Sequence, residues 1–179
     1  MEKIILVLGV FLICFSFNSC DEDDLEALVP AFDVNITKTE TIPVQIDQTN
    51  GDWVTYSEKT NLNIVNKDTE DYLNKIKEVK IVKLSYKIIN FNGDPAGEVK
   101  GKFSVASQVS LSNEFVVQTS ANNGVVYQVN EVAELNRIAA ALKSGQNVVV
   151  EYAGSALCDD SVMDFLIEVT MTAKVTIDP

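Results

Sequence analysis

The sequence predicts a mainly β protein, an antiparallel β-sandwich in which one helix crosses between the layers. Apolar and polar residues alternate along most of residues 32–177, and this period of two is typical of strands with one buried face. Turn-forming residues interrupt the alternation at 50–52, 92–97 and 122–124. Residues 131–143 break it with a helical period. A small β-barrel is the alternative arrangement of the same elements.

Strands and a short helix are expected in the first half of the domain. The first strands are expected at 32–36, 42–46 and 62–64. Asp68 or Thr69 is expected to cap a short helix through Ile76, because two acids occupy its first turn. In the long strand that follows at 79–88, the phase of the apolar residues slips by one near Val82, which predicts a β-bulge.

Four more strands and the principal helix are expected in the second half. The strands are expected at 99–105, 109–117, 148–152 and 165–177. One face of the helix carries Val132, Leu135, Ile138, Ala139 and Leu142. Asn130 is the expected N-cap of this helix, and Gly145 is expected to end it. In the last strand, apolar residues face one side and polar residues the other, so one face of its sheet should be buried.

Composition narrows the chemistry of this chain. The 179 residues carry a formal net charge of −12, and such a surface repels phosphate backbones, so nucleic acid is not expected as a partner. The chain contains no histidine, which removes the usual general base and the commonest transition-metal ligand. No Ser-x-x-Lys or related nucleophile motif is present. These features favour a non-enzymatic protein without a cofactor.

The N-terminus has the pattern of an export signal. Lys3 precedes an uncharged apolar run at 4–17, which is too short to span a bilayer. The stretch Phe17-Asn18-Ser19-Cys20 resembles a loose lipobox, the site at which bacterial lipoproteins are acylated and cleaved. The resemblance implies that residues 1–19 are removed and that Cys20 carries the lipid. The mature chain then has 179 − 19 = 160 residues, with a tether at 20–31 and one domain at 32–179.

Four acids, Asp21, Glu22, Asp23 and Asp24, directly follow this cysteine. They resemble the acidic export tag of surface-exposed lipoproteins of the Bacteroidota. That resemblance implies a lipid-anchored protein of the outer membrane that faces the medium. The alternative is an electrostatic spacer, with a domain that faces the periplasm.

The predicted architecture resembles the immunoglobulin-like sandwiches of bacterial surface lipoproteins, although no Cys–Trp–Cys spacing is present. This resemblance favours an interaction or ligand-binding module whose partner is a protein or a glycan. A small glycan-directed hydrolase is one alternative, because the two carboxylates it needs can meet in space rather than in sequence. A structural periplasmic lipoprotein is the other.

Two groups of residues are candidate sites. Asp159, Asp160 and Asp164 could bind calcium through carboxylate oxygens, but they lack an EF-hand pattern, and a solvated loop between two strands is the favoured interpretation. Asp160-Ser161-Val162 resembles the short O-glycosylation motif of Bacteroidota, which implies a sugar on Ser161.

Trp53, Tyr56 and Phe91 flank predicted turns and could stack on a sugar ring or a partner. Alternatively, these rings close the ends of the sandwich. Cys158 has no basic neighbour in sequence and is expected to be a buried packing residue rather than a reactive thiol.

Overall fold

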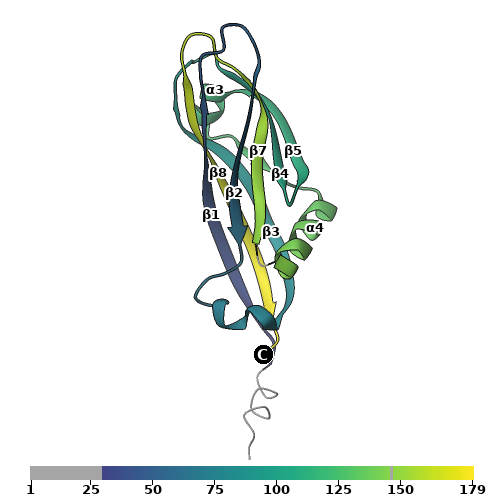
Figure 1. Ribbon diagram of the computed structural model, residues 1–179. Coiled ribbons are helices and arrows are strands. Elements are labelled where there is room, and N and C mark those ends of the chain that lie inside the picture. The colour runs from purple at the N-terminus through teal and green to yellow at the C-terminus, as the bar shows by residue number, and fades with distance from the viewer. Residues whose placement is uncertain (1–29, 146) are drawn as a thin grey trace, which may run out of the picture.

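The computed structural model describes residues 30–145 and 147–179 as two four-stranded antiparallel sheets that pack face to face (Figure 1). The strands are β1 (Phe32–Ile46), β2 (Val54–Asn63), β3 (Ile76–Asn92), β4 (Glu98–Val105), β5 (Gln108–Val116), β6 (Val126–Gln128), β7 (Asn147–Leu157) and β8 (Met163–Ile177). Sheet A has the order β1-β8-β3-β6 and sheet B the order β2-β7-β4-β5. The predicted sandwich is confirmed, because the two sheets do not join into a closed barrel.

The strands pair in a nested order that sequence reasoning did not predict. β1 pairs with β8, β2 with β7, β3 with β6 and β4 with β5, so the chain forms one long hairpin that is wound into two sheets. The β3–β8 and β4–β7 pairings join these strand pairs into the two sheets. This is the connectivity of a jelly roll, in which two interleaved Greek keys build the sandwich.

The nested pairing brings the two ends of the domain together. Phe32 lies opposite Ile177, and Ile76 lies on the other side of Ile177. At the far end of the same strands, Ile46 lies opposite Met163. We call the end with Phe32 and Ile177 the terminal pole (Figure 1). The opposite end, the loop pole, consists of the connections 47–53, 93–97, 117–125 and 158–162.

The facing sides of the sheets form a continuous apolar core. Along β8 every second residue from Met163 to Ile177 is buried, as the alternation predicts. The predicted bulge near Val82 is confirmed, since the register of β3 against β8 shifts between Ile81 and Lys83. Val82 is therefore turned outward, with 57% of its surface exposed.

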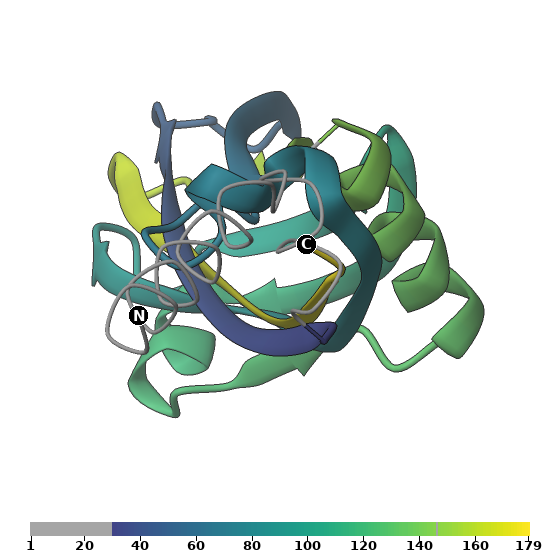
Figure 2. The same ribbon diagram turned by 90° about the horizontal axis from the view of Figure 1, so that it is seen from below.

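The predicted crossing helix is present as α4 (Val132–Gly145), between β6 and β7. Its expected inner face is confirmed, because Ile138, Ala139 and Leu142 are buried. β6 has only three residues, and α4 packs against the part of β3 that β6 leaves without a partner (Figure 2). The helix thus shields part of the edge of sheet A.

Two shorter helices differ from expectation. The expected helix before Ile76 is a 3₁₀ helix, η1 (Glu70–Lys75), and the Thr69 hydroxyl donates to the carbonyl of Ile64 (2.8 Å) instead of capping it. α3 (Val117–Asn122) replaces the end of a predicted strand. No side chain caps α3, so the usual sequence signal for a helix start is missing there.

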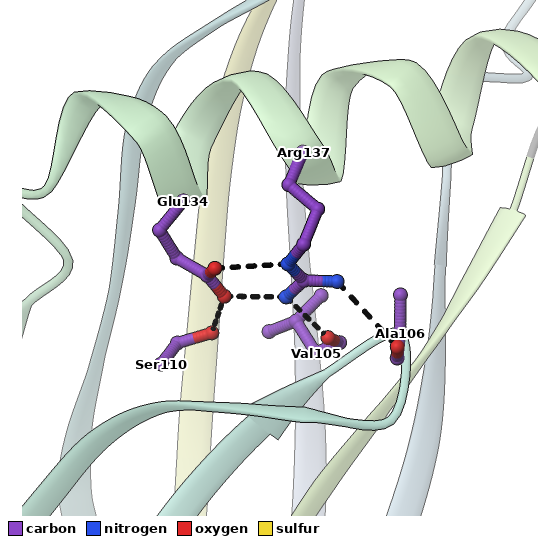
Figure 3. Close-up of polar contacts among 5 residues, drawn as sticks. All are labelled: Val105, Ala106, Ser110, Glu134 and Arg137. Atoms are coloured by element: carbon purple, nitrogen blue, oxygen red, sulfur yellow. Dashed lines mark hydrogen bonds and ion pairs between the residues drawn. The ribbon is translucent and has the colours of Figure 1, made fainter.

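A polar cluster fastens α4 to the β4–β5 hairpin (Figure 3). Arg137 donates through Nε to Glu134 (2.9 Å) and through Nη2 to the carbonyl of Val105 (2.7 Å). Its Nη1 reaches the carbonyl of Ala106 at 3.5 Å. Ser110 of β5 donates to the same Glu134 carboxylate. We call this cluster the Arg137 clasp.

The clasp holds a hairpin turn that is unfavourable by itself. Ala106 and Ser107 have φ values of 49° and 64°, in a two-residue connection where Asn and Gly are usual. The left-handed conformation costs about 1–2 kcal/mol for a residue with a Cβ atom. Because Arg137 binds the carbonyls at the turn, the helix offsets part of this cost and positions the hairpin.

We predict that Glu134→Gln lowers the free energy of unfolding at neutral pH but has little effect in acid. The Arg137 guanidinium, and then Ser110, hold the pKa of the Glu134 carboxyl below its usual value despite partial burial. A carboxyl whose pKa falls on folding stabilises the protein above its unfolded-state pKa of about 4.3, and this stabilisation is lost as the pH falls through the folded-state pKa. The loss at pH 7 should be about 1–3 kcal/mol.

Urea unfolding at pH 7 and at the lowest pH at which the wild type stays folded measures the effect. Glu131→Gln is the matched control, because Glu131 is exposed at the start of the same helix. An equal loss of stability by Glu134→Gln at both pH values would contradict an ionic role for the clasp.

Candidate functional site

The N-terminal sites predicted from the sequence lie outside the described residues. These are the signal at 1–19, Cys20 and the acids Asp21–Asp24. The lipidation and export predictions therefore stay predictions. Within the described residues, no helix is long and apolar enough to cross a membrane.

The three candidate calcium ligands have separate roles around the loop pole. The Asp159 carboxylate accepts hydrogen bonds from the Thr49 hydroxyl (2.8 Å) and the Gly51 amide (2.7 Å), so it holds the β1–β2 connection. The Asp160 amide donates to Asp94 (3.1 Å), and Asp164 lies within β8. Among residues 30–145 and 147–179, no group of three or more acids, cysteines or histidines could hold a metal ion. Calcium binding stays a prediction.

Asp94 is a buried acid that the sequence did not single out. Burial raises its pKa, but the amides of Asp160 and Ala96 donate to the carboxylate and hold the pKa below its usual value. Asp94 therefore ties the β3–β4 connection to the β7–β8 connection. Ser161 lies exposed in that second connection and is accessible for modification, which stays a prediction.

Cys158 is buried beneath the same connections. Its Sγ donates to the carbonyl of Asp47 (3.3 Å), and burial raises the pKa of the thiol. This position agrees with the expected packing role, because a buried thiol with a raised pKa is a poor nucleophile.

The three predicted stacking aromatics lie in different settings. Tyr56 turns into the sandwich, where its ring centroid is 5.9 Å from that of Tyr152, and Phe91 packs against the core. Trp53 is 37% exposed, and its ring centroid lies 4.1 Å from Nζ of Lys100 on β4. Of the three, only Trp53 has the exposure that a stacking platform needs.

The lysine beside Trp53 borders a hollow on the outer face of sheet B, with a volume of about 460 Å³. Ala153 and Ser155 of β7 form its floor. Thr55 of β2 lies opposite Ser155, while Lys100 and Lys102 of β4 lie opposite Ser155 and Ala153 on the other side. We call these five residues the sheet B hollow, and Trp53 lies beside it against Lys100. The depression forms because the small side chains of β7 lie beside the longer lysine side chains of β4.

The two lysines of the hollow differ in their partners. Lys100 lies against Trp53 and 3.4 Å from a carboxylate oxygen of Glu114 on β5. Lys102 is exposed and forms no ion pair within the described part of the chain. The hollow therefore presents one fixed and one unpaired ammonium group above a floor of hydroxyl and methyl groups.

Two glycines make sheet B thin beneath these lysines. Gly101 of β4 lies directly opposite Gly154 of β7. A Cβ atom on Gly101 would come within 2.0 Å of the Tyr152 hydroxyl, so the ring occupies the space that a side chain would need. Glycine at 101 thus allows a tyrosine to pack against the strand from inside.

Tyr152 belongs to an aromatic band across the core. Its ring centroid lies 5.3 Å from that of Tyr86, which stacks in turn on Tyr127 (4.8 Å) and Phe103 (5.0 Å). The Tyr86 hydroxyl donates to the amide oxygen of Asn113 (2.9 Å). By contrast, the buried hydroxyls of Tyr56 and Tyr152 make no hydrogen bond of ordinary geometry among the described residues and interact only with each other and with the Tyr86 hydroxyl. Desolvation raises the pKa of Tyr56, Tyr86 and Tyr152.

Comparisons with known proteins report similarity of fold alone. No family model matches the chain, and no curated protein matches it. Among solved structures, the decameric BFDV capsid protein has a TM-score of 0.46 and 6% identity, over 81% of this chain and 99% of that one. The Desmodium yellow mottle tymovirus structure has a TM-score of 0.34 and 15% identity, over 84% and 86%. The structure of Turnip yellow mosaic virus has a TM-score of 0.30 and 11% identity, over 79% of this chain and 93% of that one.

We predict that Tyr152→Phe raises the free energy of unfolding by about 1 kcal/mol, because burying an unpartnered hydroxyl costs about 1–3 kcal/mol. Tyr86→Phe is the control and should lower the same quantity, since it leaves the Asn113 oxygen without its donor. Urea unfolding of both variants provides the measurement. A loss of stability in Tyr152→Phe as large as that in Tyr86→Phe would show that the Tyr152 hydroxyl has a partner.

Proposed function

We propose that this chain is a non-enzymatic binding module, anchored by a lipid on Cys20 to a bacterial outer membrane and exposed at the cell surface. One observation supports the proposal most directly, the position of the terminal pole. The domain begins at Phe32, beside Ile177, so a tether at 20–31 would hold this pole toward the membrane. Twelve residues reach at most about 40 Å when extended. The sandwich would then project its loop pole and both sheet faces away from the lipid.

The charge of the loop pole favours this orientation. Its four connections contain Asp47, Asp52, Asp94, Asp159 and Asp160 and no basic residue. An acidic surface is repelled by anionic headgroups, so the loop pole would turn outward. Access from the medium would then include the exposed Ser161 and the sheet B hollow.

Three carboxyl groups of the domain are engaged in structural contacts, which would make them unsuited to the acid step of a glycoside hydrolase. A glycoside hydrolase needs one carboxylic acid with a raised pKa to protonate the leaving group. Within the described residues, the carboxyls with shifted pKa values are Asp33, Asp94 and Glu134, and each pKa is lowered. These groups remain ionised and suit structural hydrogen bonds. The glycan-directed hydrolase and the structural periplasmic lipoprotein remain the alternatives to test.

We predict that Cys20→Ala abolishes membrane attachment and incorporation of a labelled fatty acid. Two or three acyl chains hold a protein on a membrane, at about 0.8 kcal/mol for each buried methylene. Cys158→Ala is the matched control, because this buried cysteine should not be acylated and its loss should leave the label unchanged. Cell fractionation and fatty-acid labelling measure both variants. Label retained by Cys20→Ala would refute the anchor.

We predict that replacing Asp21, Glu22, Asp23 and Asp24 by alanine keeps the lipid but removes surface exposure. Under the export-tag hypothesis these acids direct the protein to the outside, whereas a spacer has no such effect. Protease treatment of intact cells, with total lipoprotein measured in parallel, distinguishes the two. Equal digestion of wild type and variant would identify the acids as a spacer. A wild type protected from protease would place the domain in the periplasm.

A further inference from the structure

We infer that the sheet B hollow binds a glycan whose sugars carry carboxylate groups, an inference that rests on the proposed binding function. The hollow has the size of a small-ligand site, since such sites commonly measure about 300–1,000 Å³. It is shallow and lies along the outer face of a sheet, so it suits part of an extended chain rather than an enclosed molecule. A second hollow of about 280 Å³ on the far side of Lys100 and Lys102 extends the surface toward β5.

The lining of the hollow is mostly apolar, with hydroxyl groups at Thr55 and Ser155. Thr55 and Ser155 lie side by side across β2 and β7, and Ser112 lies beyond Lys102 on β5. Hydroxyl side chains both donate and accept hydrogen bonds, as sugar hydroxyls do. Ala153, the Thr55 methyl group and the aliphatic stems of Lys100 and Lys102 supply apolar surface between them. Such a surface suits a sugar ring, which has an apolar face and hydroxyl groups at its edge.

The two lysines determine the charge of the ligand. Lys100 and Lys102 are next-but-one neighbours on β4, so both ammonium groups rise from the same face, about 7 Å apart at their Cα atoms. Lys102 has no carboxylate partner among the described residues, and a bound carboxylate would supply one. The Glu114 carboxylate, 3.4 Å from Lys100, offsets the charge of that lysine, so Lys102 supplies most of the attraction. Of the net charge of −12, the charges farther away than about 8 Å are largely screened at physiological salt.

Trp53 favours a sugar among the possible carboxylate ligands. Its indole ring lies beside the hollow with the Lys100 ammonium over one face at 4.1 Å, and the residue is 37% exposed, so the remaining ring surface is accessible to a ligand. An aromatic face packs well against the apolar side of a sugar ring. A carboxylate on the same or a neighbouring sugar would then lie within reach of the lysines.

An acidic peptide fits the hollow less well. A peptide usually adds to a sheet by pairing with a free strand edge. β7 and β4 beneath the hollow have no free edge, and a peptide paired with the edge strand β2 would lie beside the sheet rather than over the lysines of β4. Over β7 and β4 a peptide would lack backbone pairing and would depend on its side chains and charges.

Calorimetric titration of the full-length chain in detergent tests the inference. The probes are an oligomer of galacturonic acid, a neutral galactose oligomer of equal length and a polyglutamate peptide of equal charge. We expect binding of the galacturonate oligomer, at least tenfold weaker binding of the neutral oligomer and no binding of polyglutamate. Lys102→Ala and Trp53→Ala should each weaken galacturonate binding about tenfold, and added salt should weaken it further.

Lys80→Ala is the control, because Lys80 is an exposed lysine on β3 in the other sheet. Thermal unfolding of each variant verifies that the exposed side chains can be removed without loss of the fold. Equal affinity for the neutral oligomer, binding of polyglutamate that Lys102→Ala abolishes, or no binding of any probe would each overturn the inference. These outcomes leave lipid attachment untouched, since fatty-acid labelling of Cys20 measures it separately.

Discussion

The pairing of β8 between β1 and β3 is the constraint on which the rest of the structure depends. Every second side chain of β8 is buried, so a slip of one residue against either neighbour would exchange its apolar and polar faces. The observed register therefore fixes where β1 begins and where β8 ends. It places Phe32 beside Ile177, and through that contact it determines the pole from which the N-terminal segment leaves the domain. The proposed orientation on a membrane thus follows from an alternation that is visible in the sequence.

Local patterns predicted most elements, although β1 is one strand where two were expected, β2 is longer than expected and β6 was missed. Long-range pairings could not be predicted from them. The helix at 131–143 and the bulge at Val82 depend on spacings within a few residues, and both are confirmed. The nested strand order depends on contacts between residues as distant as Phe32 and Ile177, which no local pattern specifies. α3 was missed for a different reason. Val117 continues the alternation of β5 and no capping side chain precedes it, so tertiary packing of the buried Val117 decides the conformation.

The candidate site shows the same difference between local patterns, which the sequence reveals, and long-range contacts, which it does not. Trp53 was recognised as a turn-flanking aromatic, but its partner Lys100 is 47 positions away and belongs to another strand. Lys100 and Lys102 look in sequence like an ordinary solvated face. They become a candidate site only because β7 places Ala153 and Ser155 beside them. Gly101 was the one available signal, since glycine within a strand often marks a close approach. The opposite holds for Asp159, Asp160 and Asp164. They are close in sequence, but the hydrogen bonds of the loop pole give Asp159 and Asp160 different structural roles.

The distribution of cationic groups sets the kind of binding that the hollow can provide. The chain has a single arginine, and the Arg137 clasp engages its guanidinium with Glu134 and two backbone carbonyls. Contacts to an anionic ligand must therefore come from lysines. An ammonium group is a hydrated point charge without the planar fork of arginine, so it selects charge more than geometry. A shallow site with two such groups favours modest, salt-sensitive affinity. Anchoring many copies on one membrane would compensate, because a long ligand bound by one copy meets the next at high effective concentration. A surface-anchored module can thus retain a polymer that a single domain holds only briefly.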